Sequence, residues 1–367
     1  MTLSKWMEGE ILMWNQNKLT KLLGLDYPII QAPMAGGVTT SRFVSSVSNA
    51  GALGMIGAGY MQPNELRLQI REIKSLTSRT FGVNLFIPEQ PEISEEDINE
   101  AIALLQPFRN ELGIKDELPT YENECTFEEK VKIIIEEKVP VCSFTFGIPS
   151  EDVIRELKKH KIIVIGTATT VNEAVINENM GMDAVVVQGS EAGGHRGTFI
   201  KDAQESLIGL MSLVPQVVDR VNIPVIASGG VMDGRGVIAS IFLGSEAVQM
   251  GTAFLTTIES GANEQHKNAI LHAAEDETSL TTVFSGKPAR GINNQFIKEM
   301  KSRENLILDY PIQHYLTSNI RKEAARQNNP EFMSLWSGQG VRLSKRQSVN
   351  ELIKGIVSQV NQLLKEF

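Results

Sequence analysis

The chain has 367 residues, 42% of them hydrophobic and 22% charged, which is typical of a globular protein, and it has no apolar run long enough to span a bilayer. Its net charge of -9 argues against a nucleic-acid partner, because an acidic surface repels a phosphate backbone. The two cysteines, Cys125 and Cys142, match neither a disulfide framework nor metal-ligand spacing, which favours a reducing, cytoplasmic setting and no metal.

The segment MTLSKWMEGEILMWNQNK at the start of the sequence does not read as a secretory signal. Glu8 and Glu10 interrupt it where such a signal would be apolar. The pattern of the first helix begins only after Met13, which could serve as an alternative start. We therefore treat residues 1–12 as an extension and expect them to be dispensable.

Short apolar, β-branched runs alternate with amphipathic segments along the first two-thirds of the chain. Parallel strands that are buried on both faces and joined by helices give this pattern. The predicted strands are 27–32, 53–57, 81–86, 139–146, 161–167, 183–189, 223–229 and 247–251. Capped helices are predicted between them, for example 39–51, 150–160 and 170–181.

Eight βα units predict an α/β fold of the (β/α)8 TIM-barrel type, because doubly wound sheets usually have five or six strands and a glycine-rich first turn. The first strand runs instead into QAPMAGG, which lacks GxGxxG spacing. A dinucleotide-binding fold is therefore the weaker interpretation.

Two segments exceed a minimal barrel. Residues 87–127 form an acidic insertion with a predicted helix around 94–112. Residues 256–333, with predicted helices around 263–275 and 315–326, are assigned to a small, mainly helical cap domain after the eighth strand. The barrel then comprises 13–255 and 334–367, and it ends in an amphipathic helix whose apolar face carries Leu352, Ile353, Ile356, Val360, Leu363 and Leu364.

The loops after the strands of a barrel meet at one rim, and there the sequence is most unusual. ASGGVMDGRG follows the seventh strand and QMGTAF the eighth. Gly229, Gly230 and Gly251 would let backbone amides approach an anion, and a helix that opens near Asp233 would add its positive end. We interpret these turns as a phosphate cradle; the alternative is that the glycines only form tight turns.

The sixth strand ends in QGSEAGGHRGTF, a loop of small residues around His195. Such a loop suits close approach to a flat or bulky ligand, and an imidazole there could act as a base or hydrogen-bond donor. We predict that His195 is catalytic. The remaining histidines are expected to be structural: His160, His266, His272 and His314.

Three more side chains should face the same mouth. Met34 could pack on a planar ring or simply fill the core. Asn84 and Gln188 lie in apolar strands, so they need partners, either on a ring with N–H and C=O groups or in a neighbouring loop backbone.

These segments, together with KPARGINNQF at 287–296 and LWSGQG at 335–340, resemble the nitronate monooxygenases, formerly called 2-nitropropane dioxygenases, from about Met13 to the C-terminus. SEAGGHRG is the most specific of the motifs. The resemblance implies that FMN is the cofactor and that His195 is the catalytic histidine. By motif, Pro33 and Met34 would line the flavin face, and the implied FMN contacts are Asn84, Gln188, Gly193, Gly230, Gln249, Met250, Gly251 and Thr252.

The resemblance also implies the reaction, in which O2 oxidises an alkyl nitronate such as propionate 3-nitronate to a carbonyl compound and nitrite, as a detoxification. A donating or charged His195 would compensate the desolvation of the anion, and it would also act as a base if a neutral nitroalkane were used. The partners are thus a small nitronate and O2, without nucleic acid or membrane, and a homodimer is kept open.

Three other functions compete. A flavin-dependent enoyl-acyl-carrier-protein reductase using NAD(P)H shares EAGGH and the GGxxDGRG turn, but it matches less well around HRGTF and QAPMAGG. A non-catalytic flavin or nucleotide sensor has no evident need for His195. A barrel related to inosine monophosphate dehydrogenase would need a nucleophilic loop cysteine, and neither cysteine follows a late strand.

Overall fold

The computed structural model describes residues 13–115 and 126–366, so the predicted extension 1–12 and Cys125 lie outside it. Eight parallel strands form one sheet in the order β1-β9-β8-β6-β5-β4-β3-β2, and a parallel bridge between Ile30 and Leu53 joins its two edges into a barrel. The barrel strands are β1 (Ile29–Gln31), β2 (Gly54–Gly57), β3 (Phe81–Phe86), β4 (Val141–Thr145), β5 (Ile163–Ala168), β6 (Ala184–Gln188), β8 (Val225–Ser228) and β9 (Ala247–Met250). All eight predicted strands and the (β/α)8 fold are confirmed.

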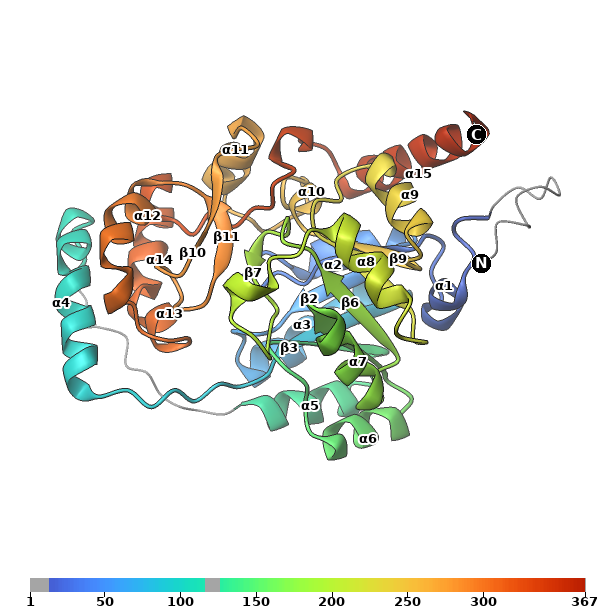
Figure 1. Ribbon diagram of the computed structural model, residues 1–367, viewed down its shortest axis with the longest axis horizontal. Helices are drawn as coiled ribbons and strands as arrows, with labels where there is room; N and C mark the ends of the chain where they lie inside the picture. Colours follow the sequence, from blue (N-terminus) through green and yellow to red (C-terminus); the bar gives the residue numbers. More distant parts are fainter. Residues whose placement is uncertain (1–12, 116–125, 367) are drawn as a thin grey trace.

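Helices connect the strands and surround the sheet (Figure 1). They are α2 (Ser41–Asn49), α3 (Pro63–Leu76), α5 (Phe127–Glu136), α6 (Glu151–Lys159), α7 (Val171–Asn179), α8 (Leu210–Val218) and α9 (Gly234–Phe242), preceded by α1 (Lys18–Leu23). Their starts follow local chemistry: the side chains of Thr40, Ser150 and Thr170 accept hydrogen bonds from the first-turn amides of α2, α6 and α7. The three helices predicted between the strands are thus confirmed.

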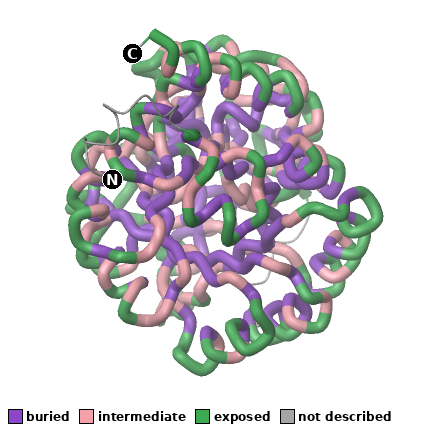
Figure 2. The backbone as a smooth tube through the Cα atoms, turned by 90° about the vertical axis from the view of Figure 1, so that its right-hand side faces the viewer, coloured by how far each residue is buried: buried purple, intermediate pink, exposed green. Residues whose placement is uncertain are grey.

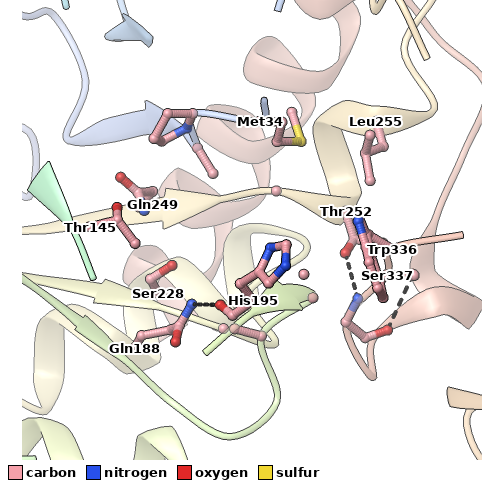
Figure 3. A pocket seen from close by; sticks show the side chains of 18 of the residues that line it. Met34, Thr145, Gln188, His195, Ser228, Gln249, Thr252, Leu255, Trp336 and Ser337 are labelled. Carbon is pink, nitrogen blue, oxygen red and sulfur yellow. Dashed lines mark hydrogen bonds between the residues drawn. The ribbon is translucent and has the colours of Figure 1, made fainter. Parts of the chain in front are cut away.

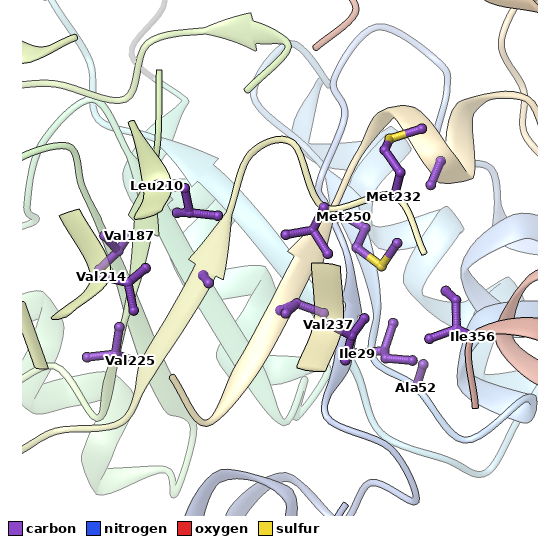
Figure 4. Close-up of a cluster of buried hydrophobic side chains, with 14 of the residues drawn as sticks. Ile29, Ala52, Val187, Leu210, Val214, Val225, Met232, Val237, Met250 and Ile356 are labelled. Carbon is purple, nitrogen blue, oxygen red and sulfur yellow. The ribbon is translucent and has the colours of Figure 1, made fainter. Parts of the chain in front are cut away.

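The hydrophobic core of the barrel lies inside the sheet and between the sheet and the helices, and Figure 2 shows the buried chain at the centre of the molecule. Figure 4 shows one cluster, in which strand residues such as Val187 and Val225 meet helix residues such as Leu210 and Val214. The final helix, α15 (Val349–Glu366), closes this cluster with Leu352, Ile353, Ile356 and Val360. None of the described helices combines the length and apolarity needed to cross a membrane.

A second, separate hydrophobic cluster belongs to the cap. After the short α10 (Thr252–Leu255), the cap contains α11 (Glu264–His272), β10 (Thr278–Thr281), β11 (Ala289–Ile292), α12 (Gln295–Met300), α13 (Ile312–Leu316) and α14 (Ser318–Arg326), with short 3-10 turns at Lys301–Leu306 and Pro330–Phe332. It is mainly helical, as predicted. A small antiparallel sheet also runs through it, ordered β10-β11-β7, where β7 is Gly194–His195.

The acidic insertion contributes to the cap. Its helix α4 (Glu95–Glu111) lies beside α12 and α14, on the far side of the cap from the barrel (Figure 1). The Phe108 ring packs 4.8 Å from that of Phe296, and Leu105 is fully buried in the same cluster. The packing of the cap therefore extends beyond the predicted bounds 256–333, because α4 and the buried Leu335 share its core.

Candidate active site

A cavity opens where the carboxyl ends of the barrel strands meet the cap (Figure 3). Nearly all the residues predicted for the site line it: Pro33, Met34, Asn84, Gln188, Gly193, His195, Gly230, Gln249, Gly251 and Thr252. Met250 does not. Its side chain is 1% exposed and lies in the hydrophobic core, so only its main chain is near the site.

The loop that carries His195 is fixed to the end of β6. The Gln188 carboxamide donates to the His195 carbonyl at 3.0 Å and accepts from the Gly197 amide at 2.9 Å. Strand β7 (Gly194–His195) also pairs with β11, with His195 opposite Ala289. Both polar ends of Gln188 are thus engaged by loop backbone, which is the alternative considered for this residue.

Two buried charges hold the same loop. The Arg196 guanidinium donates to the carbonyl oxygens of Gly189, Ser206 and Gln188, at 2.6, 2.9 and 3.2 Å. The Glu173 carboxylate, at the start of α7, accepts from the Thr198 hydroxyl and from the amides that follow it. Because each buried charge has several partners, the loop is fixed on both sides of His195.

The imidazole of His195 projects into the cavity among aromatic rings (Figure 3). The rings of Trp336, Phe146 and Tyr310 lie 5.5, 5.6 and 6.2 Å from it. Burial, with the positive charges of Lys287 and Arg321 as smaller causes, lowers the pKa of His195 from 6.5 to about 3. The imidazole is therefore neutral near pH 7, so of the two forms considered for it, charged or donating, the charged form is not the resting one.

Ser285 fixes the orientation of this ring. Its Oγ lies 2.9 Å from His195 Nε2, donates to the Lys287 carbonyl at 3.0 Å and accepts from the Lys287 amide at 3.3 Å. These contacts hold the imidazole in one plane, whichever ring nitrogen carries the proton.

The turns of the predicted cradle have the expected backbone. Gly229 and Gly230 have φ of 118° and 69°, which favours glycine. A Cβ at Gly251 would meet nothing closer than 3.7 Å, so protein packing does not require a glycine there and its open side faces the cavity. The Thr252 hydroxyl accepts from the Gly338 amide at 2.9 Å, which brings the segment after Trp336 to the same place.

The prediction that the helix near Asp233 adds its positive end to the phosphate cradle is wrong. The Asp233 carboxylate accepts from the Arg235 amide at 3.0 Å, and the Gly234 amide donates to the Gln359 side chain at 2.8 Å. The first amides of α9 thus have protein partners, and a carboxylate already compensates the positive end of the helix. The cradle consists of the turns after β8 and β9.

Two carboxamides remain available at the cavity wall. Asn84 Nδ2 donates to the Ser143 and Thr145 hydroxyls at 2.9 and 3.1 Å, whereas its Oδ1 accepts no hydrogen bond from the described residues. The Gln249 side chain makes no hydrogen bond with any residue that the structure describes, and it points into the cavity (Figure 3). A planar ring bearing N–H and C=O groups would satisfy both.

The cap supplies residues that the sequence did not reveal. Ser285, Lys287 and Tyr310 follow no barrel strand, so the rule that places function at strand ends could not find them. Lys287 pairs with Glu89 of the insertion at 2.5 Å and lies 4.8 Å from the centre of the Phe146 ring.

The described residues support neither a metal site nor a cysteine nucleophile. No group of three or more potential metal ligands occurs among them. Cys142 is fully buried within β4, and burial raises the pKa of its thiol, so it is no nucleophile.

The roles expected for the remaining histidines agree with their contacts. His266 lines the cavity, but its Nε2 lies 2.9 Å from the Trp336 carbonyl, which fixes it as a structural donor. His160 lies at the surface, 3.1 Å from Glu156.

Comparisons with known proteins agree with this geometry. The family model described as nitronate monooxygenase matches residues 16–359. The chain is 52% identical over 354 residues to a probable nitronate monooxygenase of Staphylococcus haemolyticus (strain JCSC1435), covering 96% of this chain and 99% of the relative.

Among solved structures, nitroalkane oxidase from Streptomyces ansochromogenes matches with a TM-score of 0.88 and 37% identity, covering 95% of this chain and 99% of that one. FabK from Thermotoga maritima matches with a TM-score of 0.76 and 31% identity, over 96% and 98% of the two chains. The first of these two structures is thus the more similar.

Proposed function

Since the chain belongs to the nitronate monooxygenase family of flavin-dependent oxidoreductases, we propose that it uses FMN and O2 to oxidise alkyl nitronates to carbonyl compounds and nitrite. Propionate 3-nitronate is our candidate substrate and detoxification of nitro compounds our candidate role. The observation that carries the proposal is a neutral, oriented His195 in a cavity that the cap covers.

The residues present fit an FMN molecule. The turns at Gly229–Gly230 and Gly251–Thr252 would bind the phosphate, because their glycines leave room for an anion beside backbone amides. The Gln249 carboxamide and Asn84 Oδ1 would bind polar edges of the ring, and Met34 would pack against its face. Bound FMN would accept electrons from the substrate and pass them to O2.

The pKa of His195 bears on the choice of substrate. A base whose conjugate acid has a pKa of about 3 is poorly matched to removing the α-proton of a neutral nitroalkane. A nitronate has already lost this proton. The site therefore supports the anionic nitronate, and a bound anion would raise the pKa of His195 and favour its donor role.

Aromatic rings from both the barrel and the cap line the same space. Phe146, Tyr310 and Trp336 surround the imidazole, and Ser285 holds its orientation. Beside these rings, and with the imidazole already oriented, a hydrogen bond to the nitronate would be stronger than in water.

The experiment has two parts. The cofactor is released by denaturation from the purified protein and identified by chromatography, and nitrite and O2 consumption are measured with propyl 1-nitronate. We expect FMN and stoichiometric nitrite. A colourless protein that rejects FMN, or an absence of nitrite with every nitronate offered, would refute the proposal.

A further inference from the structure

Arg321 of α14 carries a charge that no described carboxylate neutralises. Its guanidinium donates to the His314 carbonyl at 2.6 Å and to the Thr317 hydroxyl at 3.2 Å, and Nη2 lies 3.3 Å from His314 Nδ1. Each of these partners is uncharged or neutral by burial. In contrast, Arg326 on the same helix is exposed and pairs with Glu323 at 2.6 Å.

Arg321 is also surrounded by protein. Burial lowers its pKa to about 10, so it stays charged at neutral pH, yet its side chain retains some accessible surface. His195 shows the same combination and lines the cavity. A group can be both desolvated and accessible when its free surface faces an enclosed space rather than bulk water.

The contacts of Arg321 place it on the cap side of the site. The ring of His314 stacks on that of Tyr60 with centres 4.0 Å apart, and Tyr60 lines the cavity. The charge of Arg321 is close enough to lower the pKa of His195. The guanidinium is not itself among the side chains that line this cavity; it is connected to them through the rings of His314 and Tyr60.

A second polar group on the cap side also lacks a good partner. The Tyr60 hydroxyl is buried and makes no hydrogen bond of good geometry within the described ranges, although the Tyr310 hydroxyl is near it. Lys287, the other nearby cation, is already paired with Glu89. A buried, unpaired charge is costly, and an anion bound beside it would remove that cost.

We propose that Arg321 is a specificity-determining residue that binds a second anionic group, a carboxylate, at the end of the substrate remote from the nitronate carbon, with the Tyr60 hydroxyl as an additional donor. This inference rests on the proposed function. It separates two tasks: the reacting nitronate lies beside His195, and the carboxylate lies toward Arg321. Alkyl nitronates without that group would bind without this contribution.

The kinetic test compares propionate 3-nitronate with propyl 1-nitronate, in which a methyl group replaces the carboxylate. We expect Arg321→Met to raise KM for propionate 3-nitronate by roughly 10- to 100-fold, the scale of a lost charge-assisted hydrogen bond. Its kcat/KM for propyl 1-nitronate should fall far less, because only the effect of the Arg321 charge on His195 is then lost. Arg326→Met, the matched control on the same helix, should change neither. Equal losses on both substrates, or no loss on either, would overturn the proposal.

A binding test does not depend on turnover. Succinate has the shape of propionate 3-nitronate with a carboxylate in place of the nitronate, and butyrate lacks the second charge. Calorimetry should show tighter binding of succinate than of butyrate to the flavin-loaded protein, and Arg321→Met should abolish the difference. Arg321→Lys keeps the charge and should retain part of the difference in affinity between succinate and butyrate. This variant keeps the test valid if the Met variant does not fold. Equal binding of succinate and butyrate by the unaltered protein would refute the carboxylate site, whereas failure of nitronate turnover alone would refute the proposed function.

Discussion

His195 Nε2 and Ser285 Oγ lie 2.9 Å apart, although 90 residues separate them in the chain. The first residue follows a barrel strand and the second belongs to the cap, so this hydrogen bond joins the two parts of the molecule at the reactive group. Ser285 is itself fixed by the backbone of Lys287. The orientation of the imidazole therefore depends on the cap as well as on the barrel.

Removal of the imidazole should stop turnover without loss of the cofactor. His195→Ala is expected to keep bound FMN, because the cradle and the polar wall lie on other strands, and to lose about 100-fold or more in kcat, the usual contribution of a positioned proton donor or acceptor. Flavin absorbance and nitrite release on the same sample measure both. An unaltered rate in the purified variant would remove His195 from the mechanism.

Loss of the Ser285 hydroxyl should have a smaller effect. Ser285→Ala removes the hydrogen-bond partner of Nε2 and frees the ring to rotate, so we expect kcat to fall by about 10-fold, corresponding to about 1.4 kcal/mol, while FMN content is unchanged. Ser344→Ala serves as a control, because the Ser344 hydroxyl is buried without a hydrogen-bond partner in the described structure. Equal kcat for the two variants would contradict the role of Ser285.

The cradle can be tested at Gly230. Gly230→Leu forces a branched side chain onto a residue with φ of 69° and places its Cβ 3.2 Å from that of Glu191, so we expect most of the flavin to be lost on purification. Gly355→Ala, at a helical position with open space for a Cβ, is the control and should keep full flavin and at least equal stability. A Gly230→Leu protein that retains full flavin would show that the cradle is elsewhere.

Stability should fall in mild acid because His266, like His195 and His314, is buried in its neutral form. Burial lowers its pKa from 6.5 to about 4 in the folded protein. The unfolded chain takes up the proton first as the pH falls below 6.5, so stability is full above that pH and is lost toward pH 4, by up to about 1.4 kcal/mol per pH unit. His266→Gln keeps a side-chain amide donor for the Trp336 carbonyl and should flatten the decline. Thermal unfolding at pH 7.5 and 5.5 measures this decline in stability. Equal declines in the unaltered protein and in His266→Gln would disprove the role of His266.

The sequence predicted the barrel well because each strand is a short, doubly buried run with its own local signal. His195 and the glycine turns were found by one rule, the meeting of strand ends at a single rim, whereas Gln249 was implied only by the family resemblance. That rule could not identify Ser285, which lies in the cap and reaches His195 only through tertiary packing. The strand-end rule also failed for Asp233, since only the folded structure shows that the Asp233 carboxylate caps α9. The place of α4 in the cap was likewise invisible, because its partners lie far along the chain.

The central claim is that this cavity brings a nitronate, rather than a nicotinamide, to a bound flavin. Anaerobic titration of the purified holoprotein, followed by flavin absorbance, tests it most directly. Our account predicts bleaching by propionate 3-nitronate or propyl 1-nitronate and little change with NADH or NADPH. Rapid bleaching by a nicotinamide, with none by either nitronate, would contradict it.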